Sequence, residues 1–139
     1  MGLCYASGVP GPLKVLVVDD SKAARQLLCA TLESLPDTEV SEAASGFDAL
    51  KMLPRHQFDL IITDINMPDI NGLELINFVK KNPSYREVPL FILSSEAREQ
   101  DRQRGLALGA AEYLTKPFEP PALLDLVRRH LRLDVDRTG

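Results

Sequence analysis

Five short segments that are predicted to be strands, three of them continuously apolar, alternate along the chain with segments of helical periodicity. Lys14–Val18, Asp59–Thr63 and Pro89–Leu93 are continuous apolar stretches of the kind found in strands that are buried on both faces. Glu39–Ala43 is more polar, which is typical of a strand at the edge of a sheet. Glu112–Thr115 is the last predicted strand.

A helical pattern follows each predicted strand. The first begins at Ser21 and ends before Pro36, and its apolar residues form one face with the period of a helix, at Ala24, Leu27, Leu28, Thr31, Leu32 and Leu35. The other helices are predicted at Phe47–Leu53, between Gly72 and Asn82, at Ala97–Leu108 and at Pro120–Leu133. This alternation predicts an α/β fold with a doubly wound five-stranded parallel sheet, five helices on its two faces and right-handed crossovers.

The helix predicted at Ala97–Leu108 differs from the others, because Arg98–Arg104 is polar all round. Leu106 and Leu108 are the residues expected to anchor it. Such a helix is weakly held or faces a partner.

The composition is that of one soluble globular domain. The chain has 139 residues, of which 45% are hydrophobic and 26% charged. The net charge is −4 and no basic block is present, so direct binding to nucleic acid is not expected. Residues 1–12 are rich in Gly and Pro and are predicted to be a flexible leader, 13–133 the domain, and 134–139 a polar tail.

The cysteines and the apolar runs indicate the compartment. Cys4 and Cys29 have no partner at metal-ligand spacing and are read as free thiols in a reducing compartment. We find no signal-peptide pattern and no apolar run near the roughly 20 residues that cross a bilayer. The expected location is therefore the cytoplasm, with no membrane contact.

The candidate chemistry centres on Leu60–Glu74, where a buried strand delivers Asp64 to its own carboxyl end. Met67-Pro68 and Asn71-Gly72 are expected to impose loop geometry there, because Pro fixes φ and Gly tolerates positive φ. Ligands of open parallel sheets bind at that edge. A single Asp after a strand is, however, most often a turn or capping residue.

Matching groups at other strand ends favour a functional site. Asp19-Asp20 follows the first strand, Ser94 the fourth and Lys116 the last. Each has an ordinary explanation as a helix cap, a strand end or a surface charge, but all four at corresponding positions would be a coincidence. Converging carboxylates repel one another unless a cation lies among them, and hard oxygen ligands with few dedicated residues suit Mg²⁺.

These residues stand in four specific motifs, which read Val-Val-Asp-Asp-Ser, Thr-Asp-Ile-Asn-Met-Pro-Asp-Ile-Asn-Gly, Leu-Ser-Ser-Glu-Ala and Tyr-Leu-Thr-Lys-Pro-Phe. Through them the chain, over about Leu13–Leu133, resembles the response-regulator receiver domains of two-component signalling, and around the pocket it is similar to the single-domain chemotaxis type. The resemblance implies the flavodoxin-like strand order 2-1-3-4-5. It also implies a phosphorylation-dependent switch that catalyses only its own phosphoryl transfer and dephosphorylation.

The resemblance implies how phosphate and metal are held. Asp64 would be the phosphoacceptor, and the donor would be a sensor histidine kinase or a phosphotransfer protein. Asp20, Asp64 and the backbone carbonyl of Asn66 would bind Mg²⁺ directly, while Asp19 would act mainly through water. Lys116 would pair with the phosphoryl oxygens.

The resemblance also implies the parts of the switch. Ser94 would donate its hydroxyl to the phosphoryl group, and Tyr113 would be the rotating aromatic residue. The Lys116–Pro117 peptide bond is expected to be cis. Asn66 and Glu96 would flank the path of the attacking water and give rapid self-dephosphorylation.

An unknown output protein would bind the surface made by the fourth helix, the last strand and the last helix. The polar run Arg98–Arg104 departs from the more apolar helix common in the family, so partner contacts on this face do not carry over. The protein would be a monomer or a phosphorylation-dependent dimer.

Two other functions compete with this interpretation. A Mg²⁺-dependent phosphohydrolase of the haloacid-dehalogenase kind also uses an Asp at a strand end, but it needs a second Asp two residues on, where this chain has Asn66. A flavodoxin-like cofactor carrier needs a Ser/Thr/Gly-rich phosphate loop after the first strand. Asp19-Asp20 would repel the phosphate there.

Overall fold

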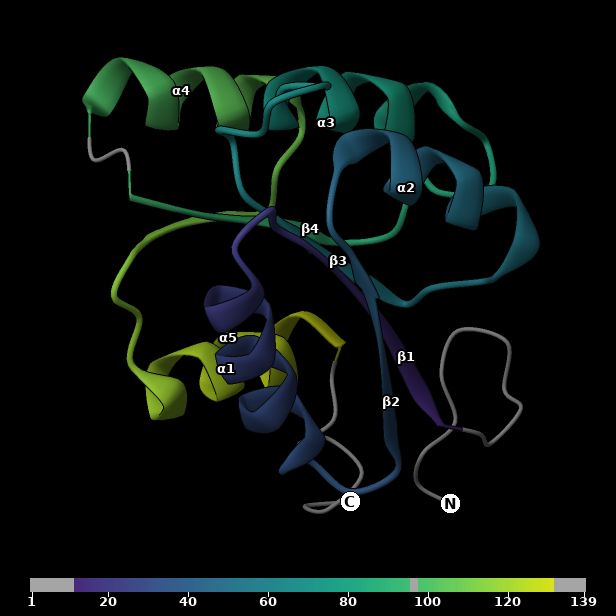
Figure 1. The fold of residues 1–139 in the computed structure, drawn as a ribbon, viewed down its shortest axis with the longest axis vertical. Helices are drawn as coiled ribbons and strands as arrows, with labels where there is room; N and C mark the ends of the chain where they lie inside the picture. Colours follow the sequence, from purple (N-terminus) through teal and green to yellow (C-terminus); the bar gives the residue numbers. More distant parts are fainter. Residues whose placement is uncertain (1–11, 96–97, 132–139) are drawn as a thin grey trace.

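The computed structural model describes residues 12–95 and 98–131, which form a single parallel sheet with helices on both faces (Figure 1). The strand order is β2-β1-β3-β4-β5, and every neighbouring pair is parallel. The strands are β1 (Leu13–Val18), β2 (Thr38–Ala43), β3 (Leu60–Thr63), β4 (Leu90–Ser94) and β5 (Glu112–Thr115). The predicted fold class and strand order are confirmed.

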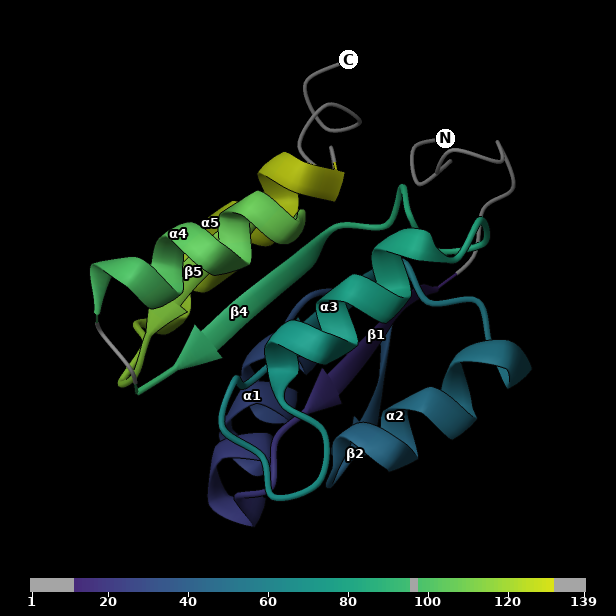
Figure 2. The ribbon, with the colours of Figure 1, turned by 90° about the horizontal axis from the view of Figure 1, so that it is seen from above.

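The helices are divided between the two faces of the sheet, as Figures 1 and 2 show. One face carries α2 (Gly46–Met52), which the 3-10 turn η1 (Leu53–Arg55) follows, together with α3 (Gly72–Lys81) and α4 (Glu99–Leu108). The other face carries α1 (Lys22–Glu33) and α5 (Pro120–Leu131). The predicted leader, apart from Pro12, and the predicted tail lie outside the described residues.

Two apolar layers hold the helices to the sheet, and the alternation of side chains along β1 separates them. Val15 and Val17 join the layer with the apolar residues of α1 and α5. Leu16 and Val18 join the layer with those of α2 and α3. All four residues of β3 are buried, whereas β2 is mostly half-buried or exposed, as expected for an edge strand.

Helix α3 begins with a capping box directly after the loop that follows Asp64. The Asn71 side chain accepts from the N–H of Leu73, and the Glu74 side chain accepts from the N–H of Asn71. Gly72 does not use the positive φ that glycine tolerates; among the described residues, Asp37 and Gly109 have a positive φ. Gly72 is needed for close approach, since a Cβ there would lie 2.1 Å from the Asp64 carbonyl oxygen.

Two predicted apolar contacts are wrong, although they lie on helices that the sequence placed correctly. Leu27 of α1 is 53% exposed, and the helix buries Cys29. Leu108 of α4 is also exposed, and Leu106 packs partly buried against the core as predicted. The backbone of α4 approaches β4 at Gly105, which is buried.

Gly72→Ala should lower the free energy of unfolding by about 2 to 3 kcal/mol, because the new methyl group overlaps the Asp64 carbonyl and the chain must shift. Urea unfolding followed by circular dichroism measures the change. Asn77→Ala, at an exposed position of the same helix, is the control and should stay within about 0.5 kcal/mol. Equal unfolding midpoints for the two variants would contradict the close packing of α3 on the end of β3.

Candidate functional site

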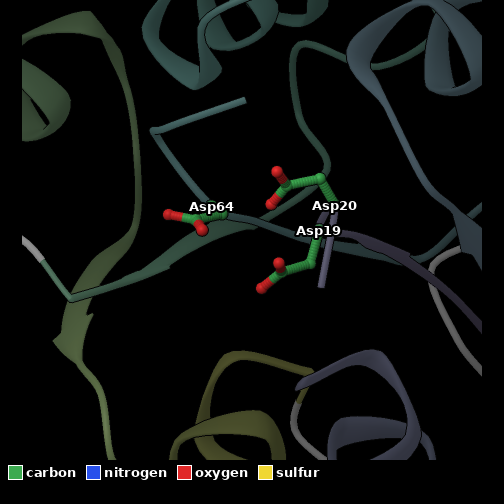
Figure 3. Close-up of side chains that lie close together, drawn as sticks. All are labelled: Asp19, Asp20 and Asp64. Carbon is green, nitrogen blue, oxygen red and sulfur yellow. The ribbon is translucent and has the colours of Figure 1, made fainter. Parts of the chain in front are cut away.

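The paired ends of β1 and β3 bring three carboxylates together. Val18 lies opposite Thr63 in the parallel register, so Asp19 and Asp64, the next residues on each strand, reach the same edge of the sheet. With Asp20 they form a cluster in which one oxygen from each carboxylate lies within 4.8 Å of the others (Figure 3). In Figure 3 the three side chains extend to the same side from the two strand ends.

Asp64 presents one of its two oxygens to the pocket. Its Oδ1 accepts hydrogen bonds from the backbone N–H groups of Ile65 at 2.7 Å and Asn66 at 3.3 Å. Its Oδ2 contacts the Lys116 ammonium at 3.2 Å. The side chain is buried, so the loop fixes the carboxylate while Oδ2 stays on the side of the other acids.

The other two acids differ in how firmly they are held. The buried Asp19 carboxylate accepts from the N–H of Ser21 at 2.9 Å and from Lys116 Nζ at 2.7 Å. Asp20 is exposed, and no described residue donates a hydrogen bond to its carboxylate. One ligand position of the cluster therefore faces water.

Lys116 is the cation that bridges Asp19 and Asp64. Its backbone N–H donates to the Ser94 carbonyl at 2.9 Å, which continues the pairing of β5 with β4. Burial alone lowers the pKa of Lys116, but the hydrogen bond to Asp19 and the charges of both carboxylates outweigh it and raise the pKa above its usual value. The peptide bond to Pro117 is cis, as expected from the resemblance.

The donor set fits Mg²⁺. Three carboxylates and one ammonium leave an excess of negative charge, which is unfavourable without a further cation. All the donors are hard oxygens, and the exposure of Asp20 leaves room for the waters that Mg²⁺ retains.

The predicted switch residues Ser94 and Tyr113 lie on the neighbouring strands β4 and β5. Ser94 is fully buried at the end of β4, opposite Thr115 of β5. Tyr113 lies half-buried on β5 opposite Ile92 and packs against the core cluster on the side of α3. Glu96 lies outside the described residues.

Asp69 is a positioning residue that the sequence did not reveal. Its carboxylate accepts from the N–H groups of Gly46 at 3.2 Å and Phe47 at 2.9 Å, in the first turn of α2. The hydrogen bond from Phe47 is the main cause of a pKa that is lowered to about 2. Asp69 thereby ties the loop after Asp64 to α2. Pro68-Asp69 reads only as a turn, because its partners lie more than 20 residues away.

Arg25 was also missed. It lies on a helix whose pattern shows only which face is apolar. In the structure its guanidinium binds the Asp19 backbone carbonyl at 2.8 Å and the Glu42 carboxylate at 2.9 Å. Asp19 directly follows β1, and Glu42 lies on β2, so neither partner belongs to α1.

A family model described as the response regulator receiver domain matches residues 15–128. The chain belongs to this family. A chemotaxis protein CheY homolog of Campylobacter jejuni is 36% identical over 112 residues, which cover 80% of this chain and 86% of that protein. Protein PilG of Pseudomonas aeruginosa is 35% identical over 119 residues, which cover 86% of this chain and 87% of that protein.

The solved structures agree with the family assignment. The chemotaxis response regulator CheY4 of Vibrio cholerae superposes with a TM-score of 0.79 at 39% identity, over 86% of this chain and 99% of that chain. The resemblance inferred from the motifs is thus confirmed, and the function is that of a phosphorylation-dependent receiver. None of the described helices is long and apolar enough to cross a membrane.

Lys116→Met should destabilise the metal-free protein by about 2 kcal/mol, because two buried carboxylates lose their cation; the open pocket keeps the cost below that of a fully buried pair. A lysine whose pKa is raised in the folded state contributes stability that is complete below its ordinary pKa of 10.5 and is lost as the pH rises through the raised value. The difference between wild type and variant should therefore be constant near neutral pH and shrink only in strongly alkaline solution.

Denaturant unfolding in the presence of a chelator measures this difference across the pH range. Lys51→Met is the matched control. The Lys51 side chain is 75% exposed, and its ammonium makes a long surface pair with Asp48 at 3.8 Å, which contributes little to stability. A loss of stability as small for Lys116→Met as for this control would contradict the bridging role.

Proposed function

We propose that Asp64 is the phosphoacceptor of this receiver domain and that a sensor histidine kinase or phosphotransfer protein supplies the phosphoryl group. The observation that carries the proposal is the convergence of Asp64 Oδ2, the Lys116 ammonium and two further carboxylates at one edge of the sheet. In the transfer, Oδ2 forms a bond to phosphorus while the bond from phosphorus to the donor imidazole nitrogen breaks. The electron pair of that bond stays on the imidazole.

The residues of the pocket supply what a weak carboxylate nucleophile lacks. Lys116 neutralises charge on the transferred oxygens, and the N–H groups of Ile65 and Asn66 hold Oδ1 so that Oδ2 faces the donor. Asp20, Asp64 and the Asn66 carbonyl would hold Mg²⁺, with Asp19 acting through water. When bound, Mg²⁺ neutralises the charge that develops on the phosphoryl group.

This function is favoured over a phosphohydrolase acting on outside substrates. The second Asp that the haloacid-dehalogenase mechanism needs is replaced by Asn66, and the family assignment supports the receiver. The domain would catalyse only its own phosphoryl transfer and dephosphorylation. Asn66, with Glu96 by resemblance, would leave the phosphorus open to water and keep the phosphorylated state short-lived.

Asp64→Asn should abolish covalent labelling by a small acyl phosphate donor such as acetyl phosphate in Mg²⁺, because the amide cannot act as the nucleophile. Asp20→Asn should also abolish labelling, through loss of Mg²⁺ binding, while relief of carboxylate repulsion stabilises the metal-free fold. Intact-protein mass spectrometry, Mg²⁺ titration and thermal unfolding measure the three effects.

Asp59→Asn is the matched control, because Asp59 precedes the same strand and accepts from the Lys14 N–H, far from the pocket end. It should be labelled like wild type. Labelling of Asp64→Asn at the wild-type level, or unchanged Mg²⁺ affinity in Asp20→Asn, would remove the basis of the site assignment.

We further propose how phosphorylation reaches the surface. The Ser94 side chain would move to donate a hydrogen bond to the phosphoryl group. Tyr113 would then turn inward into the space that Ser94 vacates. The side chain of Tyr113 already lies near α4, because a Cβ on Gly105 would come within 3.5 Å of its ring. Few apolar side chains hold α4, so a small bias shifts it.

The output partner would bind the surface formed by α4, β5 and α5 and would carry acidic groups. Arg98 pairs with Asp101 at 3.1 Å and Arg102 with Glu99 at 3.3 Å, and both arginine side chains are more than half exposed. The Arg102–Glu99 pair, in which both side chains are more than half exposed, contributes little, so an acidic partner can displace it. The Arg98–Asp101 pair differs, because the Asp101 carboxylate is buried. Arg104 adds a third positive charge. The protein would act in the cytoplasm as a monomer or a phosphorylation-dependent dimer.

Ser94→Ala and Tyr113→Ala should keep phosphorylation at Asp64 but weaken its effect on hydrogen exchange in Glu99–Leu108. Mass-spectrometric hydrogen exchange with and without beryllofluoride and Mg²⁺ measures the response. Ser95→Ala, one residue on and exposed, is the control and should respond like wild type. If all the variants respond equally, the proposed coupling is wrong.

A further inference from the structure

Arg25 joins three elements at the acidic end of β1 without belonging to the acidic cluster. From α1, its Nη1 donates to the Asp19 backbone carbonyl at 2.8 Å, and its Nε donates to Glu42 of β2 at 2.9 Å. Its side chain is 14% exposed. None of the roles described above for phosphoryl transfer or switching uses this contact.

The hydrogen bond from Arg25 is made to the peptide group between Asp19 and Asp20, and Asp20 is the acid with the fewest restraints. Asp19 and Asp64 each have a carboxylate fixed by a backbone N–H and by Lys116. Asp20 has no such donor among the described residues, so its direction depends on its backbone. Because the peptide group is planar, holding the Asp19 carbonyl oxygen also sets the plane through the Asp20 nitrogen and Cα.

We propose that Arg25 is a positioning residue for metal binding, which holds the Asp19–Asp20 peptide so that the Asp20 carboxylate faces Asp64. Glu42 in turn fixes the guanidinium. The inference rests on the proposed Mg²⁺ site. A guanidinium suits the task, because its planar fork binds a carbonyl and a carboxylate at the same time, which a lysine ammonium does less rigidly.

A positioning role and a purely electrostatic role predict opposite changes in Mg²⁺ affinity when the Arg25 side chain is removed. If the side chain acted only as a nearby positive charge, its removal would strengthen Mg²⁺ binding, because the acidic cluster would become more negative. If it acts by positioning Asp20, its removal weakens Mg²⁺ binding. The direction of the change therefore identifies the mechanism.

The experiment compares Arg25→Met, Arg25→Lys and wild type by calorimetric Mg²⁺ titration, at a temperature where circular dichroism shows each protein folded. Arg25→Met should raise the Kd for Mg²⁺ by about tenfold, the lower end for residues that orient metal ligands. Arg25→Lys, which keeps the charge, should show a smaller rise. Backbone order parameters of Asp20 in the metal-free protein should fall in Arg25→Met.

Arg129→Met is the control, because it removes an arginine from an exposed ion pair with Asp125 on α5. It should leave the Kd unchanged. A Kd for Arg25→Met that is equal to or lower than that of wild type overturns the inference and leaves the proposed site standing. A wild-type chain that binds no Mg²⁺ overturns the proposed function and the inference with it. If Arg25→Met does not fold, Arg25→Lys decides: because it keeps the charge, a raised Kd supports positioning and an unchanged Kd overturns the inference.

Discussion

Repulsion among three carboxylates at one edge of the sheet is the constraint on which the other features of this domain depend. The register of β1 with β3 makes their approach unavoidable, since Asp19 and Asp64 directly follow the last pair of residues in the two strands. Backbone N–H groups and Lys116 offset part of the repulsion in the metal-free state. The remaining negative charge favours a divalent cation, because binding of the cation would relieve the repulsion among the carboxylates.

Strand β5 runs from the acidic pocket to the proposed output surface, which α4, β5 and α5 form. Lys116 follows β5, and Tyr113 lies within it, so in the proposed switch a change in the pocket would act on a strand that also supports α4. At Gly105 the helix backbone lies close to the Ile92 and Tyr113 side chains, and few apolar side chains of α4 are buried. A helix held by close approach at one residue responds to a small movement beneath it more readily than one held by an apolar stripe.

The sequence predicted the elements, the strand order through the family resemblance, and the residues of the acidic pocket, because each depends on local periodicity or on a motif. It misjudged Leu27, which helical periodicity placed on the inner face but which is 53% exposed in the structure. It did not show that Gly72 is needed for close approach, because only the folded loop shows that a Cβ there would meet Asp64. The contacts of Asp69 with α2 and of Arg25 with Glu42 escaped notice because these partners become neighbours only once the chain is folded.

The unequal restraint of the three acids follows from where the chain turns. Asp64 lies before a loop whose N–H groups fold back onto its carboxylate, and Asp19 is caught between Ser21 and Lys116. Asp20 stands between the strand and the first turn of α1, where the N–H of Ser21 is already taken by Asp19. Its carboxylate thus faces water and would be available to the proposed Mg²⁺. A ligand that is free of protein hydrogen bonds loses none of them when a cation binds, provided that its backbone already points it toward the site.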